Sequence, residues 1–335
     1  MKDLYPLRID AYAHIAPEKY RKALEKEAPK LCRYMLDPVP PLYDLDHRFR
    51  LMDRYEGLVQ VIVPSWPSVE FAAPGKAVDL ARLLNDEMSS LLLKYPERFV
   101  AGVACLPMND MDAALKEADR AINELRFRGV LIYTPIHDKP LDAPEFMPLY
   151  EKMAQYDLPI LIHPMRAPDY PDYRTESESK YRVYMTFGWP YETTVAMTRI
   201  VFSGILEKYP NLKFITHHCG GMVPFFEERI KQFYDIADRR REIFNRDLTK
   251  APIDYYKMFY NDTAIYGNTT GLMVGYNFAG PDHLLFGVDF PLGDMDFGNR
   301  NYRQTINAIE RMEISDEDRK KIYQDNARRL FRLPI

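Results

Sequence analysis

The sequence predicts an α/β fold, a (β/α)8 TIM-type barrel in which residues 1–335 form a single domain. Two observations favour it. Eight short runs of β-branched and aliphatic residues alternate with segments in which apolar residues recur every three or four positions, as strands alternate with helices. Some runs, such as Ile160, Leu161 and Ile162, are apolar throughout, as expected of parallel strands covered on both faces. A doubly wound open sheet is the alternative, and the lack of GxGxxG and GxxxxGK(S/T) motifs weakens its nucleotide-binding form.

The eight runs give the predicted strands in chain order. These strands are residues 7–14, 59–64, 99–106, 130–133, 159–163, 213–218, 258–262 and 284–289. The predicted helices are residues 77–93, 114–125, 146–155, 192–206, 224–244 and 316–330. Asp110 and Asp112 are both candidate N-caps of the second of these helices, because a carboxylate accepts hydrogen bonds from the first free backbone N–H groups.

Two longer segments interrupt the alternation and are predicted to be irregular. Residues 15–43, an N-terminal insertion, contain five prolines, and residues 164–190 follow the fifth strand and are rich in Tyr, Arg and Pro. Irregular segments of this length inside a compact domain are usually functional covers. Segments that follow the strands of a barrel lie at its catalytic end, so residues 164–190 are predicted to form a lid.

Composition excludes several classes of protein. The formal charge is −4 and the 45 basic residues are scattered, which argues against a nucleic-acid-binding surface. The three cysteines are irregularly spaced and predict neither a disulfide framework nor a thiolate metal site. No apolar run approaches the length of about 18 residues that a membrane-spanning helix needs. We therefore expect a cytoplasmic protein without a membrane or nucleic-acid partner.

Polar side chains gather at the predicted strand ends. His14 ends the first strand, His163 the fifth, His217 and His218 the sixth, and Asp289 the eighth, so four of the seven histidines lie at three strand ends. Neutral imidazoles and a carboxylate are the usual ligands of catalytic Zn²⁺ and similar ions. Such a site acidifies a bound water, and a remaining histidine can serve as acid or base. The spacing predicts an enzyme with one metal ion.

The sequence resembles the amidohydrolase superfamily, and within it the branch that contains aminocarboxymuconate-semialdehyde decarboxylase and resorcylate decarboxylase. The similarity runs over nearly the whole chain. The motifs that carry it are the Ile9-Asp10-x-x-x-His14 start, Ile162-His163-Pro164, Thr216-His217-His218-Cys219-Gly220-Gly221, Gly287-Val288-Asp289-Phe290-Pro291, Pro190-Tyr191-Glu192-Thr193-Thr194, Arg199-Ile200-Val201-Phe202-Ser203-Gly204 and Asn326-Ala327-Arg328-Arg329-Leu330-Phe331.

The resemblance implies roles for the residues at the strand ends. His14 matches the second histidine of the family's His-x-His metal pair, and His163 matches the metal ligand of the fifth strand. Asp289 matches an aspartate that binds the metal and also moves protons. His218 matches the catalytic histidine that is not a ligand, and a neutral imidazole can accept and return a proton near pH 7. His217 would point the opposite way from a strand position and is expected to be structural.

The resemblance also implies residues that hold the substrate. Arg48 matches an arginine for the substrate carboxylate, and Arg229 matches one that reaches the site of the neighbouring subunit, which implies a homodimer. The planar guanidinium fork suits a carboxylated substrate. Arg48 could instead lie on a solvated helix face, and Arg229 in a surface charge cluster. Arg166, Phe187 and Trp189 are candidates to line the pocket, with packing of the lid as their alternative role.

Tyr12 is where this chain departs from the family, which has His or Glu there. A phenol has an ordinary pKa near ~10 and is a poor ligand unless the metal displaces its proton. Three outcomes are open: Tyr12 is a weak fourth ligand, it binds substrate or water, or metal affinity is largely lost. We expect three ligands, His14, His163 and Asp289, together with water. Asp10 is not expected to be a ligand, and Asp262 either orients a ligand or caps a helix.

The resulting functional prediction is a metal-dependent, non-oxidative decarboxylase of an aromatic or unsaturated carboxylic acid. The cofactor is expected to be one divalent ion, zinc, with manganese as the alternative. His218 and Asp289 would handle the proton, and Arg48, Arg229, Tyr12 and Trp189 would contact the substrate. A hydrolase or hydratase acting on a small carboxylated substrate is the second hypothesis. The third is a binding protein that has lost its metal chemistry.

Overall fold

The structure is a computed structural model that describes residues 7–240 and 248–335, and it confirms the predicted (β/α)8 fold. All eight predicted strand positions form strands. Within the described residues these strands are β1 (Arg8–Ile15), β2 (Leu58–Pro64), β3 (Phe99–Gly102), β4 (Ala104–Cys105), β5 (Val130–Thr134), β6 (Ile160–Pro164), β7 (Phe214–Thr216), β8 (Tyr260–Asp262) and β9 (Leu284–Leu285). The third predicted strand is divided into β3 and β4.

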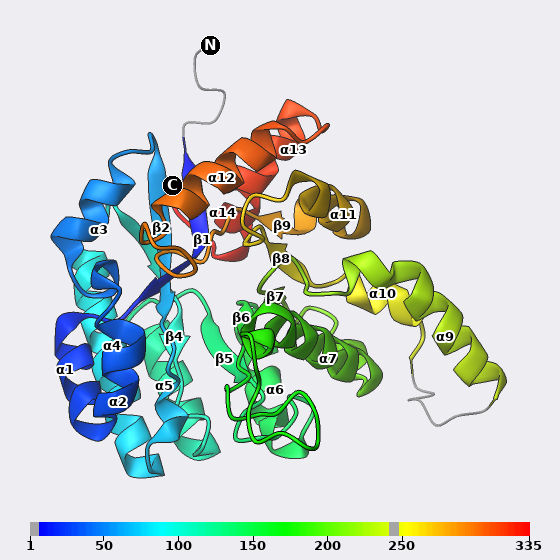
Figure 1. The fold of residues 1–335 in the computed structure, drawn as a ribbon, viewed down its shortest axis with the longest axis horizontal. Coiled ribbons are helices and arrows are strands. Elements are labelled where there is room, and N and C mark those ends of the chain that lie inside the picture. Colours follow the sequence, from blue (N-terminus) through cyan, green and yellow to red (C-terminus); the bar gives the residue numbers. More distant parts are fainter. Residues whose placement is uncertain (1–6, 241–247) are drawn as a thin grey trace.

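The strands are parallel neighbours in sequence order, in one sheet of β1, β2 and β3 and another of β4 to β9. The two sheets meet at Val103. Its N–H donates to the carbonyl of Ile62 in the first sheet, whereas the N–H of the next residue, Ala104, donates to the carbonyl of Gly129, just before β5. At the other side, the N–H of Ala11 donates to Phe286 O (2.8 Å) and that of His14 to Phe290 O (2.7 Å). These bonds join the first strand to the segment after the last, with helices on the outside (Figure 1).

The helices cover the outer faces of the strands. They are α1 (Glu18–Glu27), α2 (Pro29–Leu31), α3 (Leu45–Met52), α4 (Pro74–Lys94), α5 (Met111–Asn123), α6 (Met147–Tyr156), α7 (Trp189–Phe202), α8 (Ile205–Lys208), α9 (Glu227–Arg239), α10 (Pro252–Tyr256), α11 (Thr269–Ala279), α12 (Asn299–Glu310), α13 (Asp316–Lys320) and α14 (Asn326–Leu330). Over the two described ranges, no helix has both the length and the apolar character needed to cross a bilayer.

Most predicted helices are confirmed with shifted ends. The side chain of Asp110, and not that of Asp112, caps α5, because its Oδ1 accepts from Ala113 N at 3.0 Å. The prediction at 224–244 corresponds to a 3-10 turn followed by α9, and its last residues lie outside the described part of the chain. Residues 316–330, predicted as one helix, form α13, a π-helical turn (Lys321–Asp325) and α14 in direct succession.

The prediction for residues 15–43 was wrong, because this insertion contains α1 and α2. Pro17 is the N-cap of α1 and Pro29 is the first residue of α2. A proline at a helix start loses no hydrogen bond there, so these prolines mark where helices begin and do not exclude them. Tyr20 and Leu24 of α1 are buried against the body of the domain.

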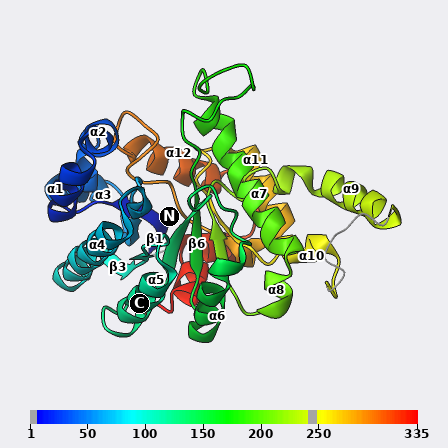
Figure 2. The ribbon, with the colours of Figure 1, turned by 90° about the horizontal axis from the view of Figure 1, so that it is seen from below.

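The segment 164–190 is irregular as predicted until a π-helical turn (Tyr184–Gly188) leads into α7. It is the green loop that rises above α7 in Figure 2. The barrel interior is packed with buried aliphatic side chains, among them Val61, Val63, Val103, Leu131, Leu161, Ile215 and Leu285. Full burial of each such side chain contributes roughly 1.5–3 kcal/mol. The barrel is therefore a solid core, and polar side chains gather where the strands end.

Candidate metal centre

Four polar side chains converge at the carboxyl ends of the strands. His14 lies on β1, His163 on β6, His217 follows β7 and Asp289 follows β9. Nε2 of His14 lies 3.3 Å, and Nε2 of His217 3.4 Å, from Oδ1 of Asp289. The ring of His163 is centred 5.2 Å from those of His14 and His217. All four residues are at most 3% exposed.

The outer nitrogen of each imidazole is anchored to an oxygen. Nδ1 of His14 lies 2.8 Å from the carbonyl of Pro64, and Nδ1 of His163 lies 2.7 Å from that of Pro164. Nδ1 of His217 is bonded to Oδ2 of Asp262. Because carbonyl and carboxylate oxygens only accept, each Nδ1 carries a proton, which leaves Nε2 as the atom that can bind a metal ion. Histidines that bind metals are held in this way.

The inner atoms have the character of metal ligands. Nε2 of His14, Nε2 of His217 and Oδ1 of Asp289 are buried without a hydrogen-bond partner in residues 7–240 and 248–335. The ligand atoms of His14, His163 and His217 all lie within 4.8 Å of one another, as do those of His217, His218 and Asp289. Three imidazoles and one carboxylate fit a divalent ion.

The expectation that the His217 side chain points away from the other strand-end residues was wrong. Strand β7 ends at Thr216, so the alternation of a strand no longer fixes the direction of the next side chain. Burial by itself lowers the pKa of His217, but Asp262 and Asp289 outweigh it and raise the pKa to about 10. His217 thus supplies the imidazole that sequence reasoning failed to find.

Tyr12 lies inside the cluster, and without a bound ion its hydroxyl stays protonated. Its ring stacks on His217 at 4.3 Å between centroids with 15° between the planes. Burial, followed by the charges of Asp262 and Asp289, raises the pKa of the phenol well above its ordinary value. Its hydroxyl is also buried without a partner in the described ranges. Tyr12 therefore packs against His217, and its unpartnered hydroxyl stays a predicted contact for an ion, water or substrate.

His218 sits beside the cluster in an unusual turn. His218, Cys219, Gly220 and Gly221 all have positive φ angles, of 56, 54, 76 and 61°. A Cβ on Gly221 would lie 2.5 Å from the carbonyl oxygen of Pro190, so this close approach requires glycine. Burial and the neighbouring His217 lower the pKa of His218 to about 3, and its Nδ1 has no partner in the described chain. His218 is a neutral imidazole next to the candidate ligands, as its catalytic role would need.

Asp10 and Asp262, the two other aspartates discussed above, differ in the groups to which they are hydrogen-bonded. A one-residue bulge in β1 between Asp10 and Ala13 turns Asp10 away. Oδ2 of Asp10 accepts from the Tyr302 hydroxyl (2.5 Å) and Oδ1 from Tyr12 N (3.0 Å), so Asp10 is not in the cluster. Asp262 orients a candidate ligand, which decides between its two predicted roles.

The structure does not support a substrate role for Arg48. Its side chain is fully buried, and Nε donates to Gln60 Oε1 (2.8 Å) while Nη1 donates to the carbonyls of His14 (2.8 Å) and Pro41 (3.2 Å). Both faces of the guanidinium are covered, by Phe99 and Phe290. Arg48 thus supports the backbone of His14. The sequence alone could not distinguish this role from binding of a substrate carboxylate.

Trp189 lies beside the cluster, next to His163 and His218. Its ring is centred 5.6 Å from His163 and 6.3 Å from His218, and its Nε1 donates to the Arg166 carbonyl at 3.2 Å. Arg166 itself is paired with Glu192 at 3.1 Å. Phe187 is 61% exposed and does not line this site.

Arg229 is on α9, which stands away from the barrel (Figure 1). It is exposed, and its guanidinium lies 4.4 Å from the ring centre of Phe233. A role in a neighbouring subunit remains a prediction. Among the remaining histidines, His283 is partly buried with Nδ1 2.6 Å from the carbonyl of Lys257, and His137 lies on the loop after β5.

Comparison with known proteins agrees with this geometry. A family model described as "Amidohydrolase" matches residues 9–333. The chain is 31% identical to gamma-resorcylate decarboxylase of Polaromonas sp. strain JS666 over 92% of each protein. It is 27% identical to 2-amino-3-carboxymuconate-6-semialdehyde decarboxylase of Dictyostelium discoideum, over 96% of this chain and 90% of the relative. A dihydroxybenzoic acid decarboxylase from Polaromonas sp. JS666, solved with manganese and the inhibitor 2-nitroresorcinol, superposes with a TM-score of 0.76, 27% identity and 97% of both chains covered.

Proposed function

The chain belongs to the amidohydrolase family, and on that premise we propose that it is a metal-dependent, non-oxidative decarboxylase of an aromatic or unsaturated carboxylic acid. The observation that carries the proposal is the convergence of three Nε2 atoms and Asp289 Oδ1 beside the neutral His218. The relatives named as decarboxylases, which match the chain over nearly its whole length, support this reaction class.

The residues that would hold the ion are His14, His163, His217 and Asp289. We propose zinc, which suits imidazole ligands, with manganese, the ion in the Polaromonas structure, as the competing choice. A bound divalent ion would orient oxygen atoms of the substrate and stabilise negative charge that develops on them. Tyr12 contributes packing against His217, and Trp189 closes the side of the site near His163.

The reaction replaces the carboxylate of the substrate by a proton. A proton is added to the carbon that carries the carboxylate, the carbon–carbon bond breaks, and its electron pair returns to the substrate as CO2 leaves. His218, neutral because of burial, can accept a proton at Nδ1 and return it. Asp289 stays ionised: burial raises its pKa, but the facing imidazoles of His14 and His217 outweigh burial and lower it. Its negative charge stabilises an imidazolium formed next to it.

The experiment is turnover of 2,6-dihydroxybenzoate and related hydroxybenzoates by metal-loaded protein in deuterated, ¹⁸O-labelled water. We expect CO2, and a product with deuterium at the carbon that lost the carboxylate and without ¹⁸O. Incorporation of ¹⁸O would support the hydrolase or hydratase hypothesis and overturn the proposal. His218→Ala should retain the metal and lose turnover, whereas His217→Ala should lose the metal. Absence of both metal and turnover in the wild-type protein would support a binding protein instead.

We further propose a single-domain homodimer in the cytoplasm. Exposed aromatic side chains at and near α9, Phe225, Phe226 and Phe233, support a subunit contact that includes Arg229. Three cysteines, all free and buried, are compatible with a reducing compartment. Light scattering after size-exclusion chromatography tests the dimer, and Arg229→Ala should reduce turnover without changing metal content.

A further inference from the structure

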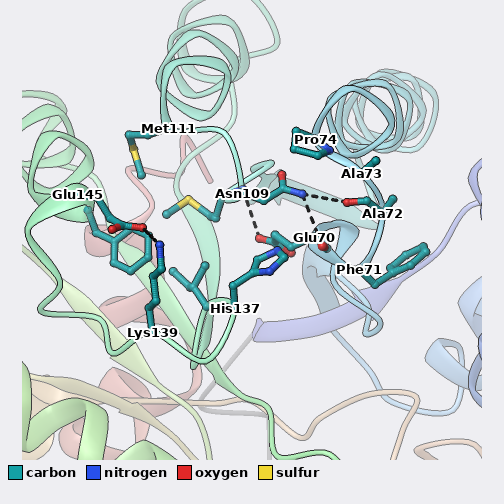
Figure 3. A pocket seen from close by; sticks show the side chains of 13 residues that line it. Glu70, Phe71, Ala72, Ala73, Pro74, Asn109, Met111, His137, Lys139 and Glu145 are labelled. Atoms are coloured by element: carbon teal, nitrogen blue, oxygen red, sulfur yellow. Dashed lines mark hydrogen bonds and ion pairs between the residues drawn. The ribbon is translucent and has the colours of Figure 1, made fainter.

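A second group of polar side chains lies at the same end of the barrel, outside the candidate metal centre. Glu70 follows β2, Asn109 follows β4 and His137 follows β5, and all three line a cavity of about 640 Å³. Figure 3 shows the Glu70 carboxylate facing the His137 ring, with Asn109 beside them. These residues are on loops that follow strands, the loops that build active sites in this fold.

Two acceptor atoms in this group lack partners. Glu70 is 7% exposed; its Oε1 accepts weakly from Met108 N (3.4 Å), while Oε2 is buried and unpartnered in the described ranges. Nδ2 of Asn109 donates to Ala72 O at 2.9 Å, which fixes the amide and leaves its buried Oδ1 without a donor in the same ranges. A buried acceptor without a donor costs about 1–3 kcal/mol. The pocket therefore calls for a ligand that donates hydrogen bonds.

The other charges of the cavity do not meet this need. Lys139 is paired with Glu145 at 2.7 Å on the far side of the cavity. Burial raises the pKa of the Glu70 carboxyl; the hydroxyl of Ser68, the backbone N–H groups of Glu70 and Met108 and, least of all, the charge of His137 oppose this effect. The unmatched atoms are thus a carboxylate oxygen and an amide oxygen, next to an imidazole.

A smaller cavity adjoins this group and has in its wall Tyr133, a neighbour of the metal centre. Its volume is about 180 Å³; Glu70 and His137 line both cavities, and Trp66, Tyr133 and Met165 also line the smaller one. The ring of Tyr133 is centred 5.4 Å from that of His163, a candidate ligand. An apolar protein cavity of about 150 Å³ is large enough to bind benzene. The smaller cavity therefore has room for one aromatic ring or a ring substituent.

We propose that Glu70 and Asn109 determine substrate specificity by accepting hydrogen bonds from an amino or hydroxyl substituent of the aromatic acid. The ring would lie between Tyr133 and Trp66, with its carboxylate toward His163 and its donor group toward Glu70. This inference rests on the proposed function and makes it narrower: the substrate is an aromatic acid with a hydrogen-bond donor remote from its carboxylate.

The test is calorimetric binding to metal-loaded protein in a His218→Ala background, so that ligands are not consumed. The probes are aminosalicylates and methylsalicylates substituted at ring positions 3, 4 and 5, compared in pairs at the same position. With Glu70 present, we expect the amino compound to bind at least about tenfold more tightly than its methyl partner at one position, because a site built for a donor rejects an analogue that lacks one. Glu70→Leu should abolish this preference and Glu70→Gln, which keeps one acceptor oxygen, should reduce it.

The matched control is Glu145→Gln, an acid of the same cavity that is already paired with Lys139, and it should keep the preference. Equal ratios with and without Glu70, or no preference at any position, would overturn the proposal. So would metal analysis that finds two ions in the wild type and one in Glu70→Leu, since the pocket would then bind a cation. If the wild-type protein never releases CO2 but the binding preference depends on Glu70, only the proposed reaction fails. If CO2 is released without the preference, only this inference fails.

Discussion

His217 is held in place by Asp262, whose Oδ2 accepts from Nδ1 of the imidazole where the neighbouring strands β7 and β8 end. Both side chains are completely buried. Oδ1 of the same carboxylate accepts from the backbone N–H groups of Cys219 (3.2 Å) and Ala264 (3.0 Å). One carboxylate thus fixes the direction of a candidate metal ligand and the turn that carries His218.

Replacing Asp262 should weaken metal binding without removing a ligand. Asp262→Asn removes the negative charge that holds the His217 ring. It also allows the NH2 group of the new amide, which cannot accept a hydrogen bond, to face Nδ1. We expect metal affinity to fall about 10- to 100-fold, the usual effect of losing such a partner. Competition with a chelator measures the dissociation constant. Asp10→Asn, a change at an equally buried carboxylate that is bonded to Tyr302, is the control and should leave the affinity within about threefold.

Removing the Tyr12 hydroxyl should leave the metal in place. The hydroxyl has no partner in the described residues, and the ring that stacks on His217 is kept in Tyr12→Phe. We expect this variant to purify with the same metal stoichiometry as the wild type, measured by plasma mass spectrometry. Tyr12→His should not raise it. A Tyr12→Phe protein that lost its ion would show that the phenol is a ligand after all.

Replacing Arg48 should affect stability more than substrate binding. Arg48→Met leaves the oxygens of Gln60, His14 and Pro41 buried without their donor, and we expect a loss of about 3 kcal/mol in the free energy of unfolding. Urea titration provides the measurement. Arg50→Met, an exposed residue of the same helix, should change it by less than about 0.5 kcal/mol. If Arg48→Met folded normally but raised KM at least tenfold, the original substrate role would be restored.

The stability of metal-free protein should depend on Asp10 between pH 4 and pH 7. Burial, the largest effect, raises the pKa of Asp10 from 3.8 to about 6 against the hydrogen bonds from Tyr302 and Tyr12. A raised folded-state pKa contributes stability below about pH 3.8, and this contribution is lost as the pH rises through about 6. The difference between the two pKa values, 3.8 and about 6, corresponds to a contribution of about 3 kcal/mol to the free energy of unfolding.

Asp10→Asn should remove this dependence. Relative to that variant, the wild type is expected to lose about 2 kcal/mol of unfolding free energy between pH 4 and pH 7 in urea titrations, most of the full contribution. Asp46→Asn, at an exposed carboxylate of α3, provides the control. Stability curves of wild type and Asp10→Asn that run parallel over this range would contradict the assignment of the effect to Asp10.

The sequence predicted the strands because their signal is local. A buried parallel strand is an apolar run that ends in polar residues, so the eight positions and the convergence of His14, His163 and Asp289 followed from alternation and strand order alone. The same rule misdirected the reading of His217. The strand ends at Thr216, two residues earlier than predicted, and the positive φ angles that follow are a property of the turn, which no periodicity reveals.

Other features depended on contacts between distant segments. Whether Arg48 faces a pocket or the core is decided by Gln60, Pro41 and two phenylalanines from elsewhere in the chain. Glu70 looks like an ordinary loop acid in the sequence, and only its burial beside Asn109 and His137 distinguishes it. The helix α1 was missed because prolines were taken as signs of irregular backbone rather than as helix starts.

The proposed ligands lie at positions 14, 163, 217 and 289, and this order has a consequence for how the protein acquires its ion. During translation His14 leaves the ribosome early, whereas Asp289 is made when most of the chain has already emerged. The three imidazoles are brought together only after β7 is made, and the centre gains its carboxylate only after β9. The complete set of candidate ligands is therefore present only late in synthesis. The ion that a purified sample contains then reflects the metals available to the finished chain as well as the preference of its ligands.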